Sequence, residues 1–420
     1  MTEPIEYFPK SVMPPDLQER IKRSVAAFRH RDFRLFYASL VAAAVGAQIQ
    51  TTANLWLIYQ LTGSPLHLGL TGLARGIPIL VFSLAGGVIA DRMDRRRLLM
   101  ITQAIAGLLS LALALLTATG RIQVWHIYVI TLLGSSMNAL HGPARNAMIP
   151  SLVPKEELLN ALSLNSTVWQ MSTLIGPALA GACIALFGLP PTYGMDGTAH
   201  LVTLTALSTI RVRPMLSPRT QSILKSLVEG IRFVGSQSII VVLLTMDCAA
   251  TFLGSYRALL PVLADHLGAG AHGLGLLFSA PAAGSLLGSA VLMSLGNVRY
   301  KGLFVVGGVV GYCLCLLMLA MSGWFPLSLL AASGLGFFDS VQAIPRNAVI
   351  QLMTPDGLRG RVSSFQRMMT NGIPALGQAQ SGAVAALLGA PLALAAGALT
   401  CTAIILGLLA ARRDLRAADL

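Results

Sequence analysis

Three ionisable residues lie inside long apolar stretches of this 420-residue sequence: Asp247, Asp339 and Arg75. Charge in an apolar setting is costly, so such residues usually face a cavity or an oppositely charged partner. A carboxyl group held away from water can take up and release a proton near neutral pH. Asp339, near the middle of its stretch, and Asp247, a third of the way along, are therefore candidates for carrying protons.

A second interpretation of the same acids stays open. Arg145 and Arg346 lie at the edges of two further apolar stretches and, with Arg75, are candidate charge partners inside the membrane. Asp339 precedes Arg346 by seven residues, which puts both on one helical face. The acid is then equally consistent with a fixed Asp-to-Arg pair between helices.

Polar residues without charge also gather in the first apolar stretch: Gln48, Thr51, Thr52 and Asn54. Gln48, Thr51 and Thr52 follow a three- and four-residue spacing, which indicates one helical face. That face either lines a cavity or makes hydrogen bonds between helices. Asp196 lies near the start of the sixth stretch, where capping of a helix N-terminus is the expected role.

The stretches that carry these residues are long enough to cross a membrane. Apolar residues make up 55% of the chain, charged residues 11%, and the mean hydropathy is +0.70, which is typical of a membrane protein. About 20 residues of helix span the hydrocarbon layer. We therefore predict an all-α protein with twelve transmembrane helices, near residues 33–60, 66–90, 98–119, 122–149, 161–187, 192–210, 238–262, 273–295, 302–321, 324–352, 363–388 and 391–411.

The two halves of the sequence repeat one another. Arg145-Asn146-Ala147 recurs 201 residues later as Arg346-Asn347-Ala348, and Gly176 and Gly181 fall on Gly377 and Gly382. A repeat of half a very apolar chain is typical of transporters built from two bundles. The predicted domains are a cytoplasmic segment (1–32), a six-helix bundle (33–210), a cytoplasmic linker (211–237), a second six-helix bundle (238–411) and a cytoplasmic tail (412–420).

The distribution of positive charge predicts the orientation. Most of the 30 Lys and Arg residues fall in segments that lie on one side of a twelve-helix chain. The positive-inside rule puts that side, with both termini, in the cytoplasm. The net charge of +13 then reflects topology and anionic lipid rather than nucleic-acid binding. The five cysteines follow no metal-site or disulfide spacing, and the sequence indicates no catalytic residue, metal site, cofactor or enzyme activity.

The loop after the second stretch resembles a family signature. Gly87, Asp91, Arg92, Arg96 and Arg97 match the Gly-x-x-x-Asp-Arg-x-Gly-x-Arg-Arg loop of the major facilitator superfamily, with Asp94 in place of a glycine. The resemblance implies two pseudo-symmetric six-helix bundles, and a gate in which this acid and these cations close the cytoplasmic side. A simple positive-inside loop is the alternative.

Two further segments extend the resemblance. Gly176, Pro177 and Gly181 resemble a Gly-Pro motif of antiporters in this superfamily, although ordinary close helix packing accounts for the same residues. The Arg-Asn-Ala segments and the stretch Phe28–Phe36 are similar to those of bacterial multidrug, macrolide and siderophore exporters.

This resemblance implies a multi-pass protein of the bacterial inner membrane that exports a small amphiphile, such as a drug or siderophore, by proton antiport and alternating access. Its expected partners are the substrate, protons, membrane lipids and export proteins of the periplasm or outer membrane. An importer of the same fold and a lipid or lysolipid translocator remain alternatives.

Overall fold

The computed structural model describes residues 26–210, 223–296 and 301–411. The side chains of residues 83–92 fall outside this description, as do the N-terminal segment before Ala26 and the first half of the linker. No strand occurs in the described ranges, where helices follow one another with short connections. The all-α fold expected from the sequence is confirmed.

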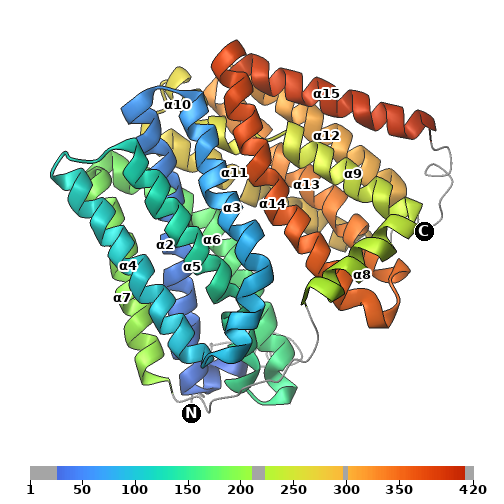
Figure 1. The fold of residues 1–420 in the computed structure, drawn as a ribbon. Helices are drawn as coiled ribbons and strands as arrows, with labels where there is room; N and C mark the ends of the chain where they lie inside the picture. Colours follow the sequence, from blue (N-terminus) through green and yellow to red (C-terminus); the bar gives the residue numbers. More distant parts are fainter. Residues whose placement is uncertain (1–25, 211–222, 297–300, 412–420) are drawn as a thin grey trace, which may run out of the picture.

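The first half of the chain forms one group of six long helices, shown in blue to green in Figure 1. A short 3-10 helix, Ala26–Arg29, precedes them. They are α2 (Arg31–Thr62), α3 (Pro65–Arg92), α4 (Arg95–Ala118), α5 (Val124–Met148), α6 (Leu158–Phe187) and α7 (Leu189–Thr209). We call this group the N-bundle.

The second half forms the C-bundle, shown in yellow to red in Figure 1. Its members are α9 (Ser238–Leu253), α10 (Leu260–His266), α11 (Gly270–Leu295), α12 (Lys301–Met321), α13 (Phe325–Met353), α14 (Asp356–Leu388) and α15 (Ala390–Ala411). The linker contributes α8 (Ile223–Ser236), whose Glu229 forms an ion pair with Arg361 of α14. The linker helix is thereby attached to the C-bundle.

Eight of the described segments are long and apolar enough to cross a membrane by length and composition. The four remaining long helices are α2, α5, α7 and α14. All four contribute polar side chains to the interior cavity described below. Their lower hydropathy therefore reflects the surface they present inside the protein, and together with the eight they account for all twelve predicted stretches.

The seventh stretch differs from the prediction because its helix is interrupted. The sequence predicted one span over 238–262, whereas α9 ends at Leu253 and α10 begins at Leu260. At the break the hydroxyl of Tyr312 donates a hydrogen bond of 3.0 Å to the carbonyl oxygen of Gly254. An added Cβ at Gly254 would lie 2.8 Å from the Tyr312 ring. The glycine thus lets α12 reach the interrupted backbone, and Arg257 lies in the break.

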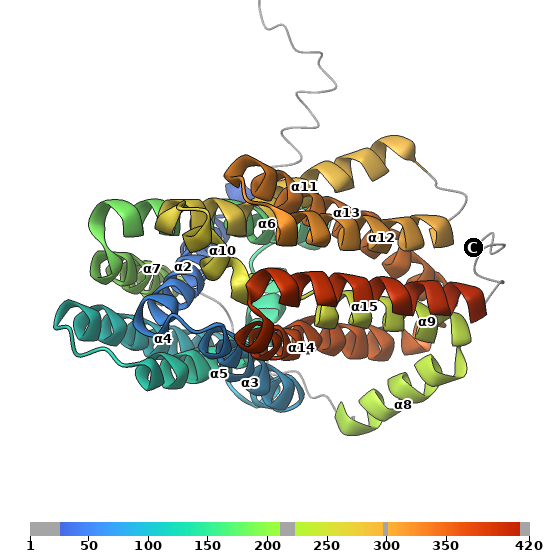
Figure 2. The same cartoon turned by 90° about the horizontal axis from the view of Figure 1, so that it is seen from above.

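The two bundles touch along two helix pairs, α3 with α14 and α6 with α11, which lie side by side in Figures 1 and 2. Glycines bring the backbones together. A Cβ added at Gly181 would lie 2.9 Å from Cα of Gly275, and one added at Gly382 would lie 2.6 Å from Cα of Gly69. Small residues at helix interfaces permit such close approach.

These contacts are concentrated at one end of the molecule. Gly69 follows the start of α3, and Gly181 precedes the end of α6, so both lie near the end where α2 joins α3. At the same end Tyr59 of α2 donates a hydrogen bond of 2.8 Å to Asp265 of α10. We call this the closed end, and the end with Arg95–Arg97 the basic end.

We expect Gly181→Leu to force α6 away from α11, because the leucine side chain has no room against the Gly275 backbone. Nitroxide labels on cysteines introduced at Thr119 and Gly323, one in each bundle at the closed end, would measure the change by electron double resonance. The label distance should increase by a few ångströms.

Gly307→Leu is the matched control, since a Cβ at Gly307 meets no heavy atom within 4 Å. Its label distance should equal that of the unsubstituted protein. An unchanged distance in Gly181→Leu would contradict the close backbone contact.

Candidate functional site

A buried ion pair crosses the interior of the C-bundle. Arg346 of α13 pairs through Nη1 with Oδ1 of Asp247 on α9, and the two residues are 3% and 5% exposed. Gln342, one turn before Arg346, donates a hydrogen bond of 3.4 Å to Asp247. Its own amide oxygen accepts one of 3.3 Å from Arg346. The pair is therefore desolvated and held by a neighbouring amide.

Asp339 belongs to the same network but not to the ion pair. Nε2 of Gln342 also donates to Oδ1 of Asp339, at 3.1 Å. In contrast to Asp247, Asp339 is exposed. The fixed pair that the sequence suggested for Arg346 is therefore made with Asp247 of another helix, and Gln342 connects it to an accessible carboxyl group.

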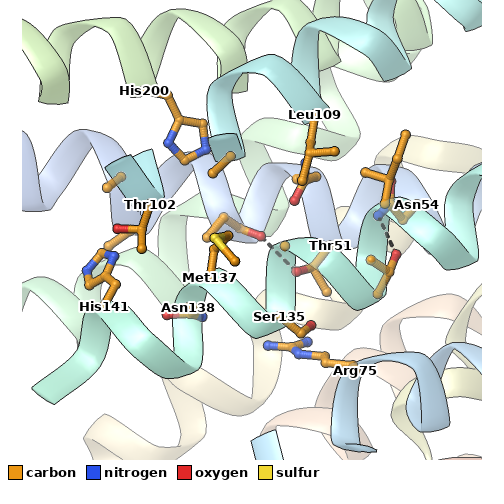
Figure 3. A pocket seen from close by; sticks show the side chains of 18 of the residues that line it. Thr51, Asn54, Arg75, Thr102, Leu109, Ser135, Met137, Asn138, His141 and His200 are labelled. Carbon is orange, nitrogen blue, oxygen red and sulfur yellow. Dashed lines mark hydrogen bonds between the residues drawn. The ribbon is translucent and has the colours of Figure 1, made fainter. Parts of the chain in front are cut away.

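The N-bundle encloses a cavity of about 150 Å³, with room for several water molecules. Its walls come from α2 to α7, and Gln378 of α14 adds a residue from the C-bundle. Figure 3 shows its polar side chains pointing toward one another from several helices. The cavity is therefore a space of a size that water can occupy, bounded by both halves of the molecule.

Two of the four polar candidates on α2 line this cavity. Thr51 and Asn54 do, and the amide of Asn54 donates a hydrogen bond of 3.2 Å to Thr131 of α5. Thr52 is buried and donates to the carbonyl oxygen of Gln48. Gln48 lies against Gly176 of α6, whose added Cβ would be 2.5 Å from that of Gln48. The predicted common face is thus divided between the cavity and α6.

Arginine side chains line the same cavity. Arg145 of α5 lies over the ring of Trp169 on α6, with Cζ 4.6 Å from the ring centroid. Arg75 of α3 is exposed and lines the cavity (Figure 3). It lies near enough to Arg257 for their charges to repel. No described carboxylate lies within ion-pair distance of Arg75, Arg145 or Arg257. Within the described residues, Arg75 and Arg145 therefore offer hydrogen-bond donors to the cavity with no carboxylate in ion-pair distance.

The sequence repeat relates the two polar faces. On α13, Asp339, Gln342 and Arg346 are spaced by three and four residues, and on α5 the residues 201 positions earlier are polar as well: Asn138, His141 and Arg145. All three α5 residues line the cavity. The C-bundle thus has a carboxylate where the N-bundle has an amide.

Sequence reasoning misassigned Asp196. It does not cap α7, which begins at Leu189, two turns earlier. Asp196 is fully buried and accepts a hydrogen bond of 2.5 Å from Ser110 of α4. His200, one turn later, is a residue that the sequence reasoning missed. An acid and a histidine four residues apart within an apolar helix indicate that the two side chains can interact.

The signature loop lies at the basic end, between α3 and α4. Gly87, Asp91 and Arg92 lie outside the described side chains. Arg96 donates hydrogen bonds to the carbonyl oxygens of Leu207 and Ser208 at the end of α7, a favourable place for a cation. Arg97 follows the N-cap of α4, where Asp94 accepts from its backbone N–H at 2.8 Å. The aspartate that departs from the signature thus has a structural role, and Arg96 binds within its own bundle.

The Gly-Pro motif lies where α6 meets two helices. Gly176 faces α2, while Pro177 and Gly181 face α11. The carbonyl oxygen of Pro177 would be 2.4 Å from a Cβ added at Gly275. The motif therefore belongs to the contact between the bundles at the closed end.

Comparison with known proteins gives the family. The family described as transmembrane secretion effector matches residues 22–420. The chain belongs to this family of the major facilitator superfamily. The enterobactin exporter EntS of Shigella boydii serotype 4 is 25% identical over 364 residues, or 86% of this chain and 85% of its own length. EntS of Escherichia coli O81 is 24% identical over 363 residues, with the same coverage.

Solved structures share the fold of this secretion-effector chain. A mutant of the nucleoside transporter NupG superposes with a TM-score of 0.72 at 12% identity, covering 90% of this chain and 99% of its own. A bacterial homologue of the lysosomal transporter Spinster, inward-facing and occupied, gives 0.70 at 13% identity, covering 91% and 96%. These structures show the fold, while the family match and the enterobactin exporters confirm the predicted superfamily and its similarity to siderophore exporters.

We expect Arg346→Leu to destabilise the protein, because it leaves the Asp247 carboxylate buried without a partner. Loss of one member of a buried pair costs about 3–5 kcal/mol. The double variant Asp247→Leu/Arg346→Leu should recover much of this loss. Thermal unfolding in lipid nanodiscs at neutral pH measures both.

Arg359→Leu breaks the exposed pair with Asp356 and serves as the control, with an expected cost of about 0–1 kcal/mol. Equal unfolding temperatures for Arg346→Leu and Arg359→Leu would contradict the buried pair.

Proposed function

We propose that this chain exports a small amphiphilic molecule across the bacterial inner membrane in exchange for protons, by alternating access. The observation that carries this proposal is the connection of an accessible carboxyl group, Asp339, through Gln342 to the buried pair of Asp247 and Arg346. The description of its family as secretion effectors and the naming of its relatives as enterobactin exporters support the outward direction.

The proposed orientation places the basic end and both termini in the cytoplasm. Positive charge is retained on that side of bacterial membranes. The closed end then faces outward, and the conformation is one that admits solute from the cytoplasm. The similarity to an inward-facing Spinster homologue supports this assignment. Movement of the bundles about the α3/α14 and α6/α11 contacts would open the outer side.

The coupling follows from the chemistry of the network. When Asp339 is ionised, it accepts the hydrogen bond from Gln342 and balances positive charge in the interior. Protonation from the outer side weakens that acceptor and leaves the interior more positive. Each proton driven inward by 100 mV supplies about 2.3 kcal/mol, which supports a concentration ratio of more than tenfold. Asp247 has the second role, as the acid that stabilises Arg346.

The arginines that have no carboxylate partner among the described residues narrow the proposed substrate class. Arg75 and Arg145 present N–H groups to the cavity with no described carboxylate in ion-pair distance. Guanidinium groups bind carboxylate and related oxygen acceptors in bidentate geometry. A molecule rich in oxygen acceptors, as siderophores are, fits this interior better than a cationic drug. Export partners in the periplasm or outer membrane remain an expectation of the resemblance.

Transport in proteoliposomes tests the proposal. With a pH gradient imposed and a pH-sensitive dye inside, addition of enterobactin should produce a proton flux opposite to the solute flux. Asp339→Asn should abolish the flux, because the amide cannot release a proton. Ethidium, a cationic amphiphile, tests the drug alternative.

Other outcomes would contradict the proposal. Solute and protons moving in the same direction would identify an importer. Movement of a fluorescent lysolipid without either solute would identify a lipid translocator. Proton-driven export that survives Asp339→Asn would remove this carboxyl group from the coupling step.

We expect Arg75→Gln to raise the KM for enterobactin export about tenfold or more, since hydrogen bonds to charged groups contribute about 1.5–3 kcal/mol. Arg75→Lys should have a smaller effect because it keeps the charge but loses the fork of donors. Initial export rates over a range of concentrations give both values.

Arg121→Gln, which removes an exposed arginine from the loop before α5, is the control and should leave the KM unchanged. An unchanged KM in Arg75→Gln would contradict the role of the arginines in substrate binding.

A further inference from the structure

A second group of ionisable side chains lies in the N-bundle, away from the Asp339 network. Asp196 and His200 occupy successive turns of α7, with Nε2 of His200 3.6 Å from Oδ1 of Asp196. Asp196 is 0% exposed and His200 8%. Neither residue has a role in the exchange proposed above.

The residues packed around Asp196 leave room for its carboxyl group. A Cβ at Gly46 of α2 would lie 2.5 Å from Oδ1. The other oxygen, Oδ2, accepts from Ser110 at 2.5 Å, and Ser110 in turn accepts from Gln50 at 2.9 Å. Oδ1 itself has no hydrogen-bond donor in the structure. A buried carboxyl oxygen without a donor is costly, and one added proton would satisfy it.

The hydrogen bonds of His200 locate that proton. Nδ1 of His200 lies 2.5 Å from Oε1 of Gln103, which can only accept, so Nδ1 carries a hydrogen. A neutral imidazole then turns the bare lone pair of Nε2 toward Oδ1 of Asp196. The contact becomes favourable when one proton is added, either to Nε2 or to Oδ1.

A polar connection links this pair to the cavity. The amide nitrogen of Gln103 donates to Nδ1 of His141 at 3.3 Å. His200, Gln103 and His141 all line the cavity, whereas Asp196 lies behind them. Water in the cavity therefore reaches the two imidazole groups, and through His200 the acid.

The charges around the pair are few. Among the described residues, α2 presents Gly46 and Gln50 to it, and α4 presents Gln103 and Ser110, all of them uncharged. α7 itself adds Tyr193 next to Asp196, and α5 adds His141 with Arg145 beside it. His200 is thus the basic group next to the Asp196 carboxyl group. Arg145 is connected to that carboxyl group only through His141.

We propose that Asp196 and His200 form a second proton-binding site, in the N-bundle, which exchanges its proton with the cavity through His200 and the Gln103–His141 connection. This inference rests on the proposed function, because the proton bound there is one of those exchanged for the substrate. The protein would then carry one proton site in each bundle.

Two transport measurements in proteoliposomes test the site: accumulation driven by a pH difference, and exchange at equal pH. The probe is enterobactin or ethidium, whichever the unsubstituted protein carries. At a pH difference of one unit, each coupled proton supports about a tenfold concentration ratio. Asp196→Asn and His200→Gln should therefore lower pH-driven accumulation about tenfold. Exchange of labelled for unlabelled probe at equal pH should continue, because it needs no net proton movement.

Asp356→Asn removes an exposed acid at the start of α14 and is the matched control, with accumulation unchanged. Full accumulation in Asp196→Asn would overturn the second site while leaving the exchange at Asp339 intact. Absence of pH-driven accumulation in the unsubstituted protein would instead overturn the proposed function, and the second site with it.

A second measurement does not depend on transport. Nitrogen-15 magnetic resonance of labelled histidines, with His200→Gln to assign the signal, reports which ring nitrogen carries hydrogen. We expect His200 to keep hydrogen on Nδ1 and to gain it on Nε2 as the pH falls, with a different midpoint in Asp196→Asn. A His200 protonated only on Nε2 at every pH would overturn the proposal.

Discussion

Removing a charged side chain from water costs more free energy than a packing contact returns, and this constraint orders the interior of the protein. The acids of the described interior show three arrangements. Arg346 and Asp247 neutralise one another, Asp339 is exposed, and Asp196 depends on a neighbouring imidazole. Because the environment sets the charge state of each group, a change in solvent access to one of them changes the energy of the whole conformation.

The contacts between the bundles determine where that access can change. Glycines allow backbone contact between α3 and α14 and between α6 and α11, so each bundle behaves as a unit that meets the other along two lines. Packed interfaces tend to have discrete alternative arrangements rather than continuous ones. In the proposed cycle, closure at one end and charge in the interior are therefore linked: the movement that separates the glycine contacts would expose the polar faces of α5 and α13 to the other side.

Much of the fold could be predicted from the sequence, because hydrophobic length is a local property. All twelve predicted stretches are helical, most with ends within a few residues of those observed. The exception is the interruption between α9 and α10, which depends on Tyr312 contacting Gly254 from a helix far along the chain. Apolar composition alone contains no sign of that contact.

The site was less predictable, since its pairs join residues that are distant in sequence. The sequence identified Asp247, Asp339 and Arg346 and left a fixed Asp-to-Arg pair between helices open, but it did not say which acid pairs with Arg346, which is Asp247 of α9. It gave Asp196 a role at a helix end, because the two prolines before it suggested that the helix begins there. Only the packing of α2 and α4 on α7 brings Gly46, Ser110 and Gln103 around the acid and His200.

The central claim is that binding of substrate and binding of protons oppose one another within one conformational cycle. The most direct test is proton release on substrate binding. Purified protein in weakly buffered solution, with a pH-sensitive dye, would be mixed with enterobactin. Our account predicts that binding releases protons into solution and weakens as the pH is lowered. Enterobactin binding that is independent of pH and releases no proton would contradict it.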